Sequence, residues 1–502
     1  MLFRSIMFGI LIALWYELLF IIVWIFYSIT YPLVYISILL PLLLHPSATI
    51  DKYYYMYNSI KYILFCRDKK KKSKYTKNVS VVGEMDHTDP SVYFPGYNST
   101  SSVDTNNNQS DINNNNITTG SKITKKTIIF IRHGESTWNY TFNKGNERST
   151  ISFLLYFIPN LLQTLSYEYY YYLTGQATES LLYDSPLSIN GIQQAQTIQN
   201  FISTTNLQFV TPKEEKYLSL LKGNHTVTTT EIVKMSNTTS TNDSTVTTNH
   251  DTTTTNSSTT LYLVSNLRRA ITTAGIAFYP QLLQPSSSSA PRTTTTTATT
   301  SPNKLRIVSA LQEISTNPDA LCISPPSSSS SNHTMVGSDS DPVPIRRYIY
   351  GNRNTSSGSS DGDDGDNMKS STGGAGVMDT TYHTGNKSLS STGQERIQEF
   401  CHLLFRNNHP VKDSTITDTT TTNGISHAQN YIVTGHSLWF LTFFQLLLPT
   451  SCHHVAKKKK LQNGSIIGFT LLHTTTTSTT NNESADHYMI DPTSLVVVHG
   501  GF

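Results

Sequence analysis

The sequence has few of the features that mark disulfide-bonded, metal-bound or nucleic-acid-binding proteins. Its 502 residues include only 4 cysteines, and none of them forms a Cys-x-x-Cys pair. This scarcity argues against a disulfide scaffold and a cysteine-based metal site, and it fits a reducing compartment. The formal net charge of +3 is too small to indicate a nucleic-acid partner. Since no cluster of metal-ligating residues is visible either, we expect no metal and no cofactor.

Charged residues are almost absent near the N-terminus, where Glu17 is the only one in 5–44. About 20 apolar residues cross a bilayer, so this stretch predicts a transmembrane or membrane-hairpin segment with a bend at Pro32. A cleaved signal peptide is the alternative, although signal peptides have shorter apolar cores. Lysine-rich sequence at 61–77 follows. By the positive-inside rule it predicts that the remaining chain faces the cytosol, and its charge predicts a membrane-lipid partner.

Long stretches lack hydrophobic periodicity and consist mostly of Ser, Thr and Asn. They predict a disordered linker and several disordered inserts at surface loops, where long insertions cost little stability. The linker is expected at 79–121 and the inserts at 223–260, 285–302, 325–332, 354–374, 413–423 and 474–482. The predicted organisation is a membrane anchor at 1–48, a basic juxtamembrane segment and disordered linker at 49–121, and one domain at 122–502.

Between these tracts, short apolar runs alternate with segments of helical pattern. Strands are predicted at 127–131, 261–265, 306–310, 431–434, 465–472 and 494–499, and helices at 189–203, 267–283, 394–406 and 437–448. This alternation predicts an α/β fold, a three-layer sandwich with a mostly parallel central sheet. The apolar, Tyr-rich stretch 151–173 is interpreted as additional core. A helical lid, a pocket wall and a second membrane-contacting surface stay open as alternatives.

An Arg-His-Gly sequence follows the first predicted strand, at the edge of the sheet where ligands bind in open parallel folds. Arg132 offers a forked guanidinium that fits phosphate oxygens, His133 is a nucleophile for a phosphoryl group, and Gly134 lets the backbone approach a ligand. For so short a motif, a solvated Arg-His pair is the alternative. The longer stretch Arg-His-Gly-Glu-Ser-x-Trp-Asn resembles the signature of the histidine phosphatase superfamily, in its phosphoglycerate-mutase-like branch.

Further blocks resemble this superfamily and follow in its order. The block Asp-x-Pro-Leu-Ser-x-x-Gly-x-x-Gln-Ala, which begins at Asp184, has a mainly structural role there. In Ser-x-Leu-x-Arg-Ala-x-x-Thr-Ala, Arg269 matches the phosphate-binding arginine, whereas Arg268 is interpreted as a solvated charge. Glu313 matches the proton donor, although an isolated surface Glu is the alternative. His436, in Gly-His-Ser, matches the second histidine, which holds the phosphoryl oxygens.

The resemblance implies a histidine-type phosphatase, that is, a membrane-anchored phosphomonoester hydrolase that acts on a phosphorylated substrate through a phosphohistidine intermediate. The expected catalytic residues are His133, Glu313 and His436, and the expected phosphate-binding residues are Arg132, Asn139, Arg269 and His436. The predicted location is a membrane, with the catalytic domain facing the cytosol. Two alternatives remain open. One is phosphoglycerate-mutase-type phosphotransfer, although the Gly-Trp and Glu-Arg-His-Tyr-Gly elements of those enzymes are missing. The other is a catalytically inactive membrane scaffold with a phosphatase fold.

Overall fold

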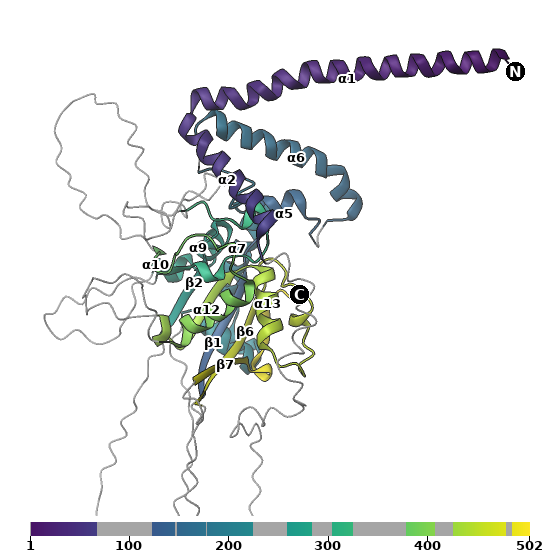
Figure 1. Ribbon diagram of the computed structural model, residues 1–502. Helices are drawn as coiled ribbons and strands as arrows, with labels where there is room; N and C mark the ends of the chain where they lie inside the picture. The colour runs from purple at the N-terminus through teal and green to yellow at the C-terminus, as the bar shows by residue number, and fades with distance from the viewer. Residues whose placement is uncertain are drawn as a thin grey trace, which may run out of the picture.

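The computed structural model describes residues 2–67, 123–145, 148–176, 178–223, 259–283, 304–324, 378–406, 425–477 and 484–502. The predicted linker at 79–121 and nearly all residues of the predicted inserts lie outside these ranges. Figure 1 shows an α/β body from which a long N-terminal helix extends. The candidate site lies within the α/β body.

The centre of this body is a mixed sheet of eight strands. They are β1 (Ile123–Arg132), β2 (Thr260–Ser265), β3 (Leu305–Val308), β4 (Met378–Asp379), β5 (Asn430–Gly435), β6 (Ile466–Thr477), β7 (Ser484–Ile490) and β8 (Val496–His499). Their order is β4-β3-β2-β5-β1-β6-β7, and β8 also pairs with β6. Strands β4, β3, β2, β5 and β1 are parallel to their neighbours in this order, whereas β6 runs antiparallel to β1, β7 and β8. Strand β1 therefore lies inside the sheet, at the point where parallel pairing changes to antiparallel pairing.

The α-helices of the described residues cover both faces of the sheet or, at the N-terminus, extend away from it (Figure 1). They are α1 (Leu2–Leu44), α2 (Pro46–Phe65), α5 (Thr137–Phe142), α6 (Thr150–Leu173), α7 (Ile189–Thr204), α8 (Pro212–Leu221), α9 (Arg268–Ala277), α10 (Tyr279–Leu283), α12 (Gly393–Phe405) and α13 (Ser437–Leu447). Short 3-10 helices are η2 (Leu207–Phe209), η3 (Ser309–Leu311), η4 (Pro318–Ala320), η5 (Ile425–His427), η6 (Val455–Lys457) and η7 (Pro492–Ser494). Ile129 and Ile131 of β1 pack with α7, α8 and α9, whereas Ile128 and Phe130 pack with α12 and α13. Because alternate residues of a strand face opposite sides, β1 is buried on both.

Aromatic packing fixes α13 beside β1. The ring of Phe130 stacks on Phe440, with 4.3 Å between ring centroids, and meets Phe443 edge-on at 4.9 Å. Trp439 lies 5.8 Å from Phe130 in the same cluster, and its indole N–H donates to the carbonyl of Ala310 at 2.8 Å. Edge-on and offset ring pairs stabilise beyond their buried area. The helix that starts after Gly-His-Ser is thereby held against the strand that precedes Arg-His-Gly.

The N-terminal arm differs from its prediction. The backbone stays helical from Leu2 to Leu44, through Pro32, where a bend was expected, and α2 begins after His45. Within the residues that the structure describes, no helix combines the length and the apolar content that a bilayer crossing requires. The transmembrane or membrane-hairpin segment and the membrane location were therefore wrong predictions. Nothing in the described residues supports the membrane-lipid partner. The lysines at 69–77 lie outside the described residues.

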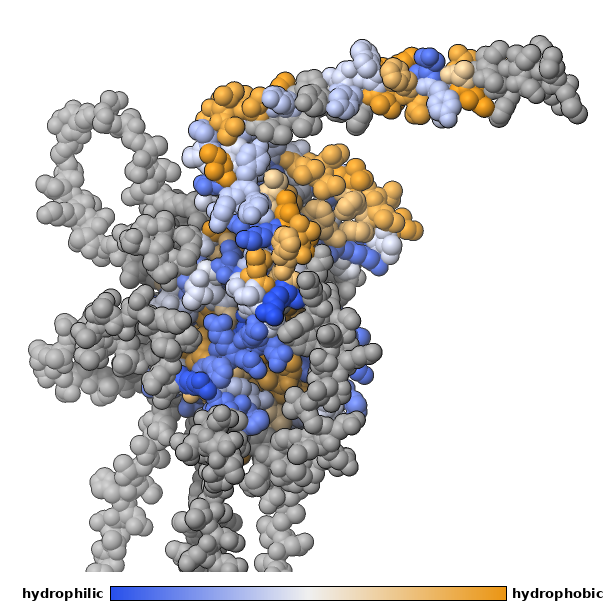
Figure 2. Space-filling model, in the orientation of Figure 1, coloured by the Kyte–Doolittle hydropathy of each residue, from blue (hydrophilic) through white to orange (hydrophobic). Residues whose placement is uncertain are grey.

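Helix α6 covers the stretch that was interpreted as additional core, yet it turns polar residues inward. Thr164 and Glu168 are its buried residues, whereas Ile151, Leu154 and Leu155 are exposed. Figure 2 shows hydrophobic side chains gathered on the outer surface of this helix. The interpretation as additional core is therefore incorrect, because the buried stripe of the helix is polar. Its position depends on hydrogen bonds and an ion pair.

That ion pair joins α6 to α2. Lys52 of α2 is only 1% exposed; its ammonium lies 3.4 Å from Glu168 Oε2 and donates to the carbonyl of Glu179 at 2.6 Å. Glu168 Oε1 accepts from the hydroxyl of Ser180 at 2.6 Å and from the N–H of Leu182 at 3.0 Å. Burial lowers the pKa of Lys52, and Glu168 opposes that shift. Helix α2, α6 and the segment after α6 are thus fixed together by buried polar groups that require one another.

We expect Lys52→Met to lower the free energy of unfolding by about 3 kcal/mol, because Glu168 would keep a buried charge without its cation. Lys61→Met, at an exposed position of the same helix, should change it by less than about 0.5 kcal/mol. Urea denaturation of the full chain, followed by tryptophan fluorescence, measures both changes. Equal losses in the two variants would contradict a specific role for the buried pair.

Candidate active site

The turn after β1 depends on a close approach between two backbone segments. The N–H of Gly134 donates to the hydroxyl of Thr273 in α9 at 3.1 Å. A Cβ on Gly134 would lie 2.3 Å from the carbonyl oxygen of Gly191, and a Cβ on Gly191 would lie 2.0 Å from the carbonyl oxygen of Glu135. Only glycine fits at both positions. The block that begins at Asp184 therefore packs the start of α7 directly against the Arg-His-Gly turn.

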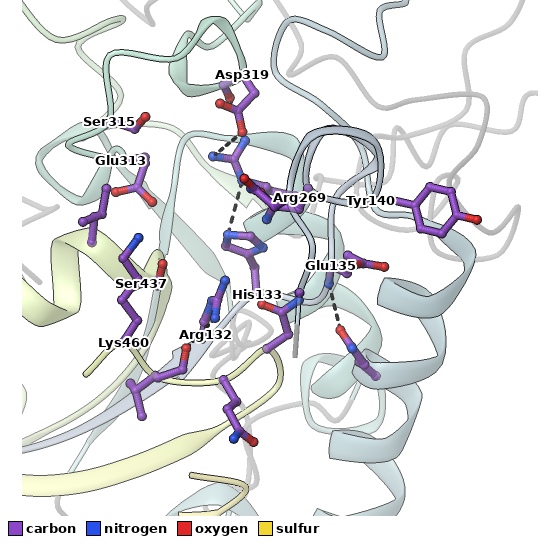
Figure 3. A pocket seen from close by; sticks show the side chains of 18 of the residues that line it. Arg132, His133, Glu135, Tyr140, Arg269, Glu313, Ser315, Asp319, Ser437 and Lys460 are labelled. Atoms are coloured by element: carbon purple, nitrogen blue, oxygen red, sulfur yellow. Dashed lines mark hydrogen bonds and ion pairs between the residues drawn. The ribbon is translucent and has the colours of Figure 1, made fainter. Parts of the chain in front are cut away.

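The His133 side chain is 2% exposed, and two contacts fix its tautomer. Nδ1 lies 2.6 Å from the carbonyl oxygen of Gly134, which can only accept, so Nδ1 carries the proton. Nε2 accepts from the Nε–H of Arg269 at 3.3 Å (Figure 3). Burial lowers the pKa of His133 well below its usual value, and the charges of Arg269 and Arg132 lower it further. His133 is thus a neutral imidazole whose Nε2 presents a lone pair.

Two arginines lie beside this imidazole. Arg269, in the first turn of α9, is buried; its Nη1 donates to the carbonyl of Asp319 at 2.6 Å, and its Nη2 lies 3.5 Å from Asp319 Oδ2. Arg132 donates from Nη1 to the carbonyl of Leu461. Its Nε is buried and has no hydrogen-bond partner among the described residues. Burial lowers the pKa of Arg132 to about 10, which leaves it charged near neutral pH.

Two carboxyl groups complete the charged part of the site. Burial raises the pKa of Asp319 to about 6; Arg269 opposes this shift and Glu313 adds to it. Glu313 follows η3 and is buried. Its Oε1 accepts from the N–H of Ile314 at 2.8 Å, and its backbone carbonyl accepts from Lys387 Nζ at 2.8 Å. These contacts fix the Glu313 carboxyl at the carboxyl end of the sheet, where β3 ends.

His436, the N-cap of α13, lies behind His133, with 4.9 Å between ring centroids. Its Nε2 lies 2.8 Å from Oγ of Ser265, which also accepts from the N–H of Leu267 at 3.4 Å. The Ser265 hydroxyl can therefore donate to Nε2, and in that tautomer the imidazole proton is on Nδ1. Nδ1 is buried with no partner among the described residues. Burial lowers the pKa of His436 well below its usual value, and Arg269 lowers it further.

The structure brings most of the predicted site residues to one cavity of about 940 Å³. The predicted residues that line it are Arg132, His133, Asn139, Arg269 and Glu313. His436 is not among the lining residues and reaches the site from behind His133. The amide oxygen of Asn139 accepts from Asn143 Nδ2 at 2.6 Å, which orients the Asn139 side chain. Within the described parts of the chain, no group of three or more His, Cys, Asp or Glu is placed to hold a metal ion.

Arg268 was interpreted as a solvated charge, and that interpretation is wrong. Its side chain is fully buried: Nε donates to the carbonyl of Asp184 at 2.9 Å and Nη2 donates to the carbonyl of Ser180 at 2.9 Å. Its backbone N–H donates to Asp184 Oδ1 at 2.8 Å. Asp184 adopts a φ of +44°, which is uncommon for a residue other than glycine. This strained residue thereby caps α9, the helix that carries Arg269.

Motif matching also missed residues that border the site. Ser265 lies inside a matched block and is the last residue of its strand. The carboxyl ends of parallel strands meet at one edge of a sheet, so its position could have indicated a contact with the site. Asp319 follows Glu313 in the same loop, but nothing in the sequence indicates its pairing with Arg269. Lys459 and Lys460 belong to a run of lysines, a pattern that predicts an exposed surface. In the structure both of them line the cavity.

No family model matches the sequence, and no curated protein matches it. Solved structures do match, and three of them each cover 73% of this chain and 97% of their own. Two of the three are mycobacterial hydrolase 1 (9% identity, TM-score 0.25) and a mycobacterial glucosyl-3-phosphoglycerate phosphatase in complex with VO3 (9% identity, TM-score 0.24). The third is a protein of Escherichia coli proposed to be an alpha-ribazole-5'-P phosphatase (10% identity, TM-score 0.23). The resemblance of the chain to the histidine phosphatase superfamily rests on its sequence motifs.

The buried imidazoles predict how stability depends on pH. An unfolded chain protonates histidine near the usual pKa of about 6.5, whereas His133 stays neutral in the folded chain at lower pH. The unfolded state then binds more protons, so the free energy of unfolding should fall as the pH decreases below this value. We expect His133→Asn to reduce the loss between about pH 7 and pH 5 by about 2 kcal/mol in urea denaturation.

Asp319 acts in the opposite direction, because its raised pKa makes the folded chain bind a proton below about pH 6. Both proteins contain Asp319, so this effect cancels in the comparison. His453→Asn changes an exposed histidine outside the cavity and serves as the control, with an expected pH dependence like that of the parent chain. Identical pH dependence of His133→Asn and the parent chain would show that His133 is not held neutral by burial.

Proposed function

We propose that the chain is a phosphomonoester hydrolase that acts through a phosphohistidine formed on His133. The observation that carries this proposal is the neutral imidazole with its proton on Nδ1 and its Nε2 beside two arginines. A neutral imidazole nitrogen is a nucleophile, and guanidinium groups offset the charge of a phosphate dianion. A solvated Arg-His pair, the alternative reading of this motif, would be exposed and would have no reason for a fixed tautomer.

In the proposed first step, the Arg269 Nε–H turns from His133 Nε2 to a phosphoryl oxygen. The freed Nε2 lone pair attacks phosphorus, and the bond from phosphorus to the ester oxygen breaks. Glu313, in its protonated form, donates its proton to that departing oxygen. Arg132 and Arg269 bind the remaining phosphoryl oxygens. The buried Nδ1–H of His436, unpartnered among the described residues, supplies a further hydrogen bond. Fixed donors of this kind stabilise the charge that is redistributed as phosphate transfers.

In the second step, the Glu313 carboxylate accepts a proton from water, and the water oxygen attacks phosphorus. The P–N bond breaks, inorganic phosphate leaves, and His133 regains its neutral form. Transfer of the phosphoryl group to a substrate hydroxyl in place of water would make the chain a mutase. We favour hydrolysis because the chain lacks the Gly-Trp and Glu-Arg-His-Tyr-Gly elements of phosphoglycerate mutases.

Removing the nucleophile should abolish turnover. We expect His133→Ala to lose essentially all hydrolysis of an aryl phosphate, whereas His453→Ala, at an exposed histidine outside the cavity, should keep it. Rapid acid-free quenching with radiolabelled substrate should trap label on the parent chain in a form that is stable in base and labile in acid, as a phosphoramidate is. Label of the same stability on His133→Ala would place the intermediate on another residue and reject the mechanism.

The proton donor should matter in proportion to the basicity of the leaving group. We expect Glu313→Gln to lower kcat for an alkyl phosphate by about 10²–10⁴, and to lower kcat for a nitrophenyl phosphate far less, because that leaving group needs no proton. Glu215→Gln, at an exposed position of α8, is the matched control. Equal losses on the two substrates would assign Glu313 a role other than proton donation.

A further inference from the structure

The loop at 312–322 carries both acidic residues that lie close to the two histidines, Glu313 and Asp319. Apart from the short helix η4, this range has no regular secondary structure. Figure 3 shows Glu313 and Ser315 of the loop on one side of the cavity, away from Tyr140. The backbone groups of such a loop need hydrogen-bond partners from elsewhere in the fold. The position of the proposed proton donor therefore depends on what those partners are.

Lys387 supplies partners on both sides of Glu313. It is only 6% exposed, and its ammonium donates to the carbonyl of Glu313 at 2.8 Å and to the carbonyl of Ser315. Its backbone N–H donates to Oε1 of Gln312 at 2.8 Å. An ammonium has three donors and can hold several carbonyls at once. Since Lys387 does not line the cavity, it acts on Glu313 through the backbone.

Two helices reinforce this contact. Arg396 of α12 is buried, and its Nη1 donates to the carbonyl of Gln312 at 2.7 Å and to that of Glu313 at 3.3 Å. The carbonyl of Glu313 thus accepts from two buried cations. From α2, the ring of Tyr62 faces the ammonium of Lys387, with 5.8 Å between its centroid and Nζ. An aromatic face attracts a cation, so α2 contributes to the site that holds the loop.

We propose that Lys387 is a positioning residue for proton transfer, which holds Glu313 where its carboxyl reaches the leaving oxygen. The inference rests on the proposed function and adds the group that aligns its proton donor. A general acid must lie within about 2.6–3.2 Å of the atom that it protonates, and a displacement of about 1 Å can cost about 10² in rate. Without the ammonium, the carbonyls of Glu313 and Ser315 would lose a buried donor, and the turn between them would be free to shift.

Replacement of the ammonium in the full chain tests the proposal. We expect Lys387→Met to lower kcat for an alkyl phosphate by about tenfold to 10²-fold, with KM nearly unchanged, because the phosphate-binding arginines stay in place. The loss of kcat for a nitrophenyl phosphate should be far smaller, since that leaving group needs no proton. A smaller amount of folded protein would lower both rates equally. The two substrates therefore separate positioning from support of the fold.

Lys126→Met is the matched control. Lys126 is 4% exposed, its ammonium donates to the carbonyl of Ser426 at 2.7 Å and to that of Ala428, and it does not line the cavity. The variant removes the same kind of contact from another loop, so kcat for the two substrates should fall by the same factor or not at all. In a Glu313→Gln background, Lys387→Met should add little to the loss for the alkyl phosphate, because the group that it positions is already absent.

Tyr62→Leu is a milder second variant, which keeps Lys387 and an apolar side chain in α2 but removes the ring that faces the ammonium. We expect the same substrate preference as in Lys387→Met, with a smaller loss. If Lys387→Met does not fold, Tyr62→Leu decides. Equal losses on the two substrates, or no loss on the alkyl phosphate, would then overturn the proposal.

Hydrogen–deuterium exchange follows the loop without turnover. Exchange at 312–322 should be faster in Lys387→Met and unchanged in Lys126→Met, because only the first variant removes a contact of this loop. Equal losses on the two substrates, the same preference in Lys126→Met, an additive loss in the Glu313→Gln background or unchanged exchange at 312–322 would each overturn the assignment, even if phosphomonoesters are hydrolysed. If the parent chain hydrolyses none, the proposed function fails, whereas selectively faster exchange would still assign Lys387 to this loop.

Discussion

Arg269 contacts both His133 and Asp319 from the first turn of α9, and this contact sets the charge state of the site. Because the Nε–H of Arg269 points at Nε2 of His133, a proton on that nitrogen would place two donors against each other. Burial is the largest cause of the lowered pKa of His133, and the charge of Arg269 adds to it, so the imidazole stays neutral. Asp319 balances the guanidinium from its other end. A buried cation, a neutral base and a carboxylate thus hold one another in place before any substrate binds.

The position of Arg269 depends in turn on residues far from the cavity. Its neighbour Arg268 donates to Asp184 and to the segment that follows α6, and it lies 3.5 Å from Glu179. That segment is fixed by α2, because the ammonium of Lys52 donates to the Glu179 carbonyl. Helix α2, which sequence reasoning divided between the end of the anchor and the juxtamembrane segment, therefore supports the start of α9. Such buried polar contacts stabilise little in net terms, but they determine one arrangement of the backbone.

The residues with the strongest local patterns were predictable. The buried strand β1, the turn after it and the arginine at the start of α9 all lie in short, contiguous blocks. Their positions therefore follow from the local sequence. Helix α8 was missed although Thr211 and Glu214 form a capping box with Pro212 between them, which is a readable start signal. Strand β4 has only two residues and has no pattern to read. Helix α6 was misread because apolar content indicates burial only on average, and here the inward stripe is formed by Thr164 and Glu168.

Arg268 and Arg269 show why the rest could not be predicted. Consecutive residues of a helix point about 100° apart, so one arginine reaches the cavity and the other reaches the opposite side of the helix start. A motif match selects Arg269, but it cannot state whether Arg268 is solvated, because that depends on whether distant segments provide acceptors. Asp184 provides them from 84 positions earlier in the chain, in a backbone conformation that few residues adopt. The chemistry of this site is therefore local in sequence, whereas the hydrogen bonds that position it join segments that meet only in the folded chain.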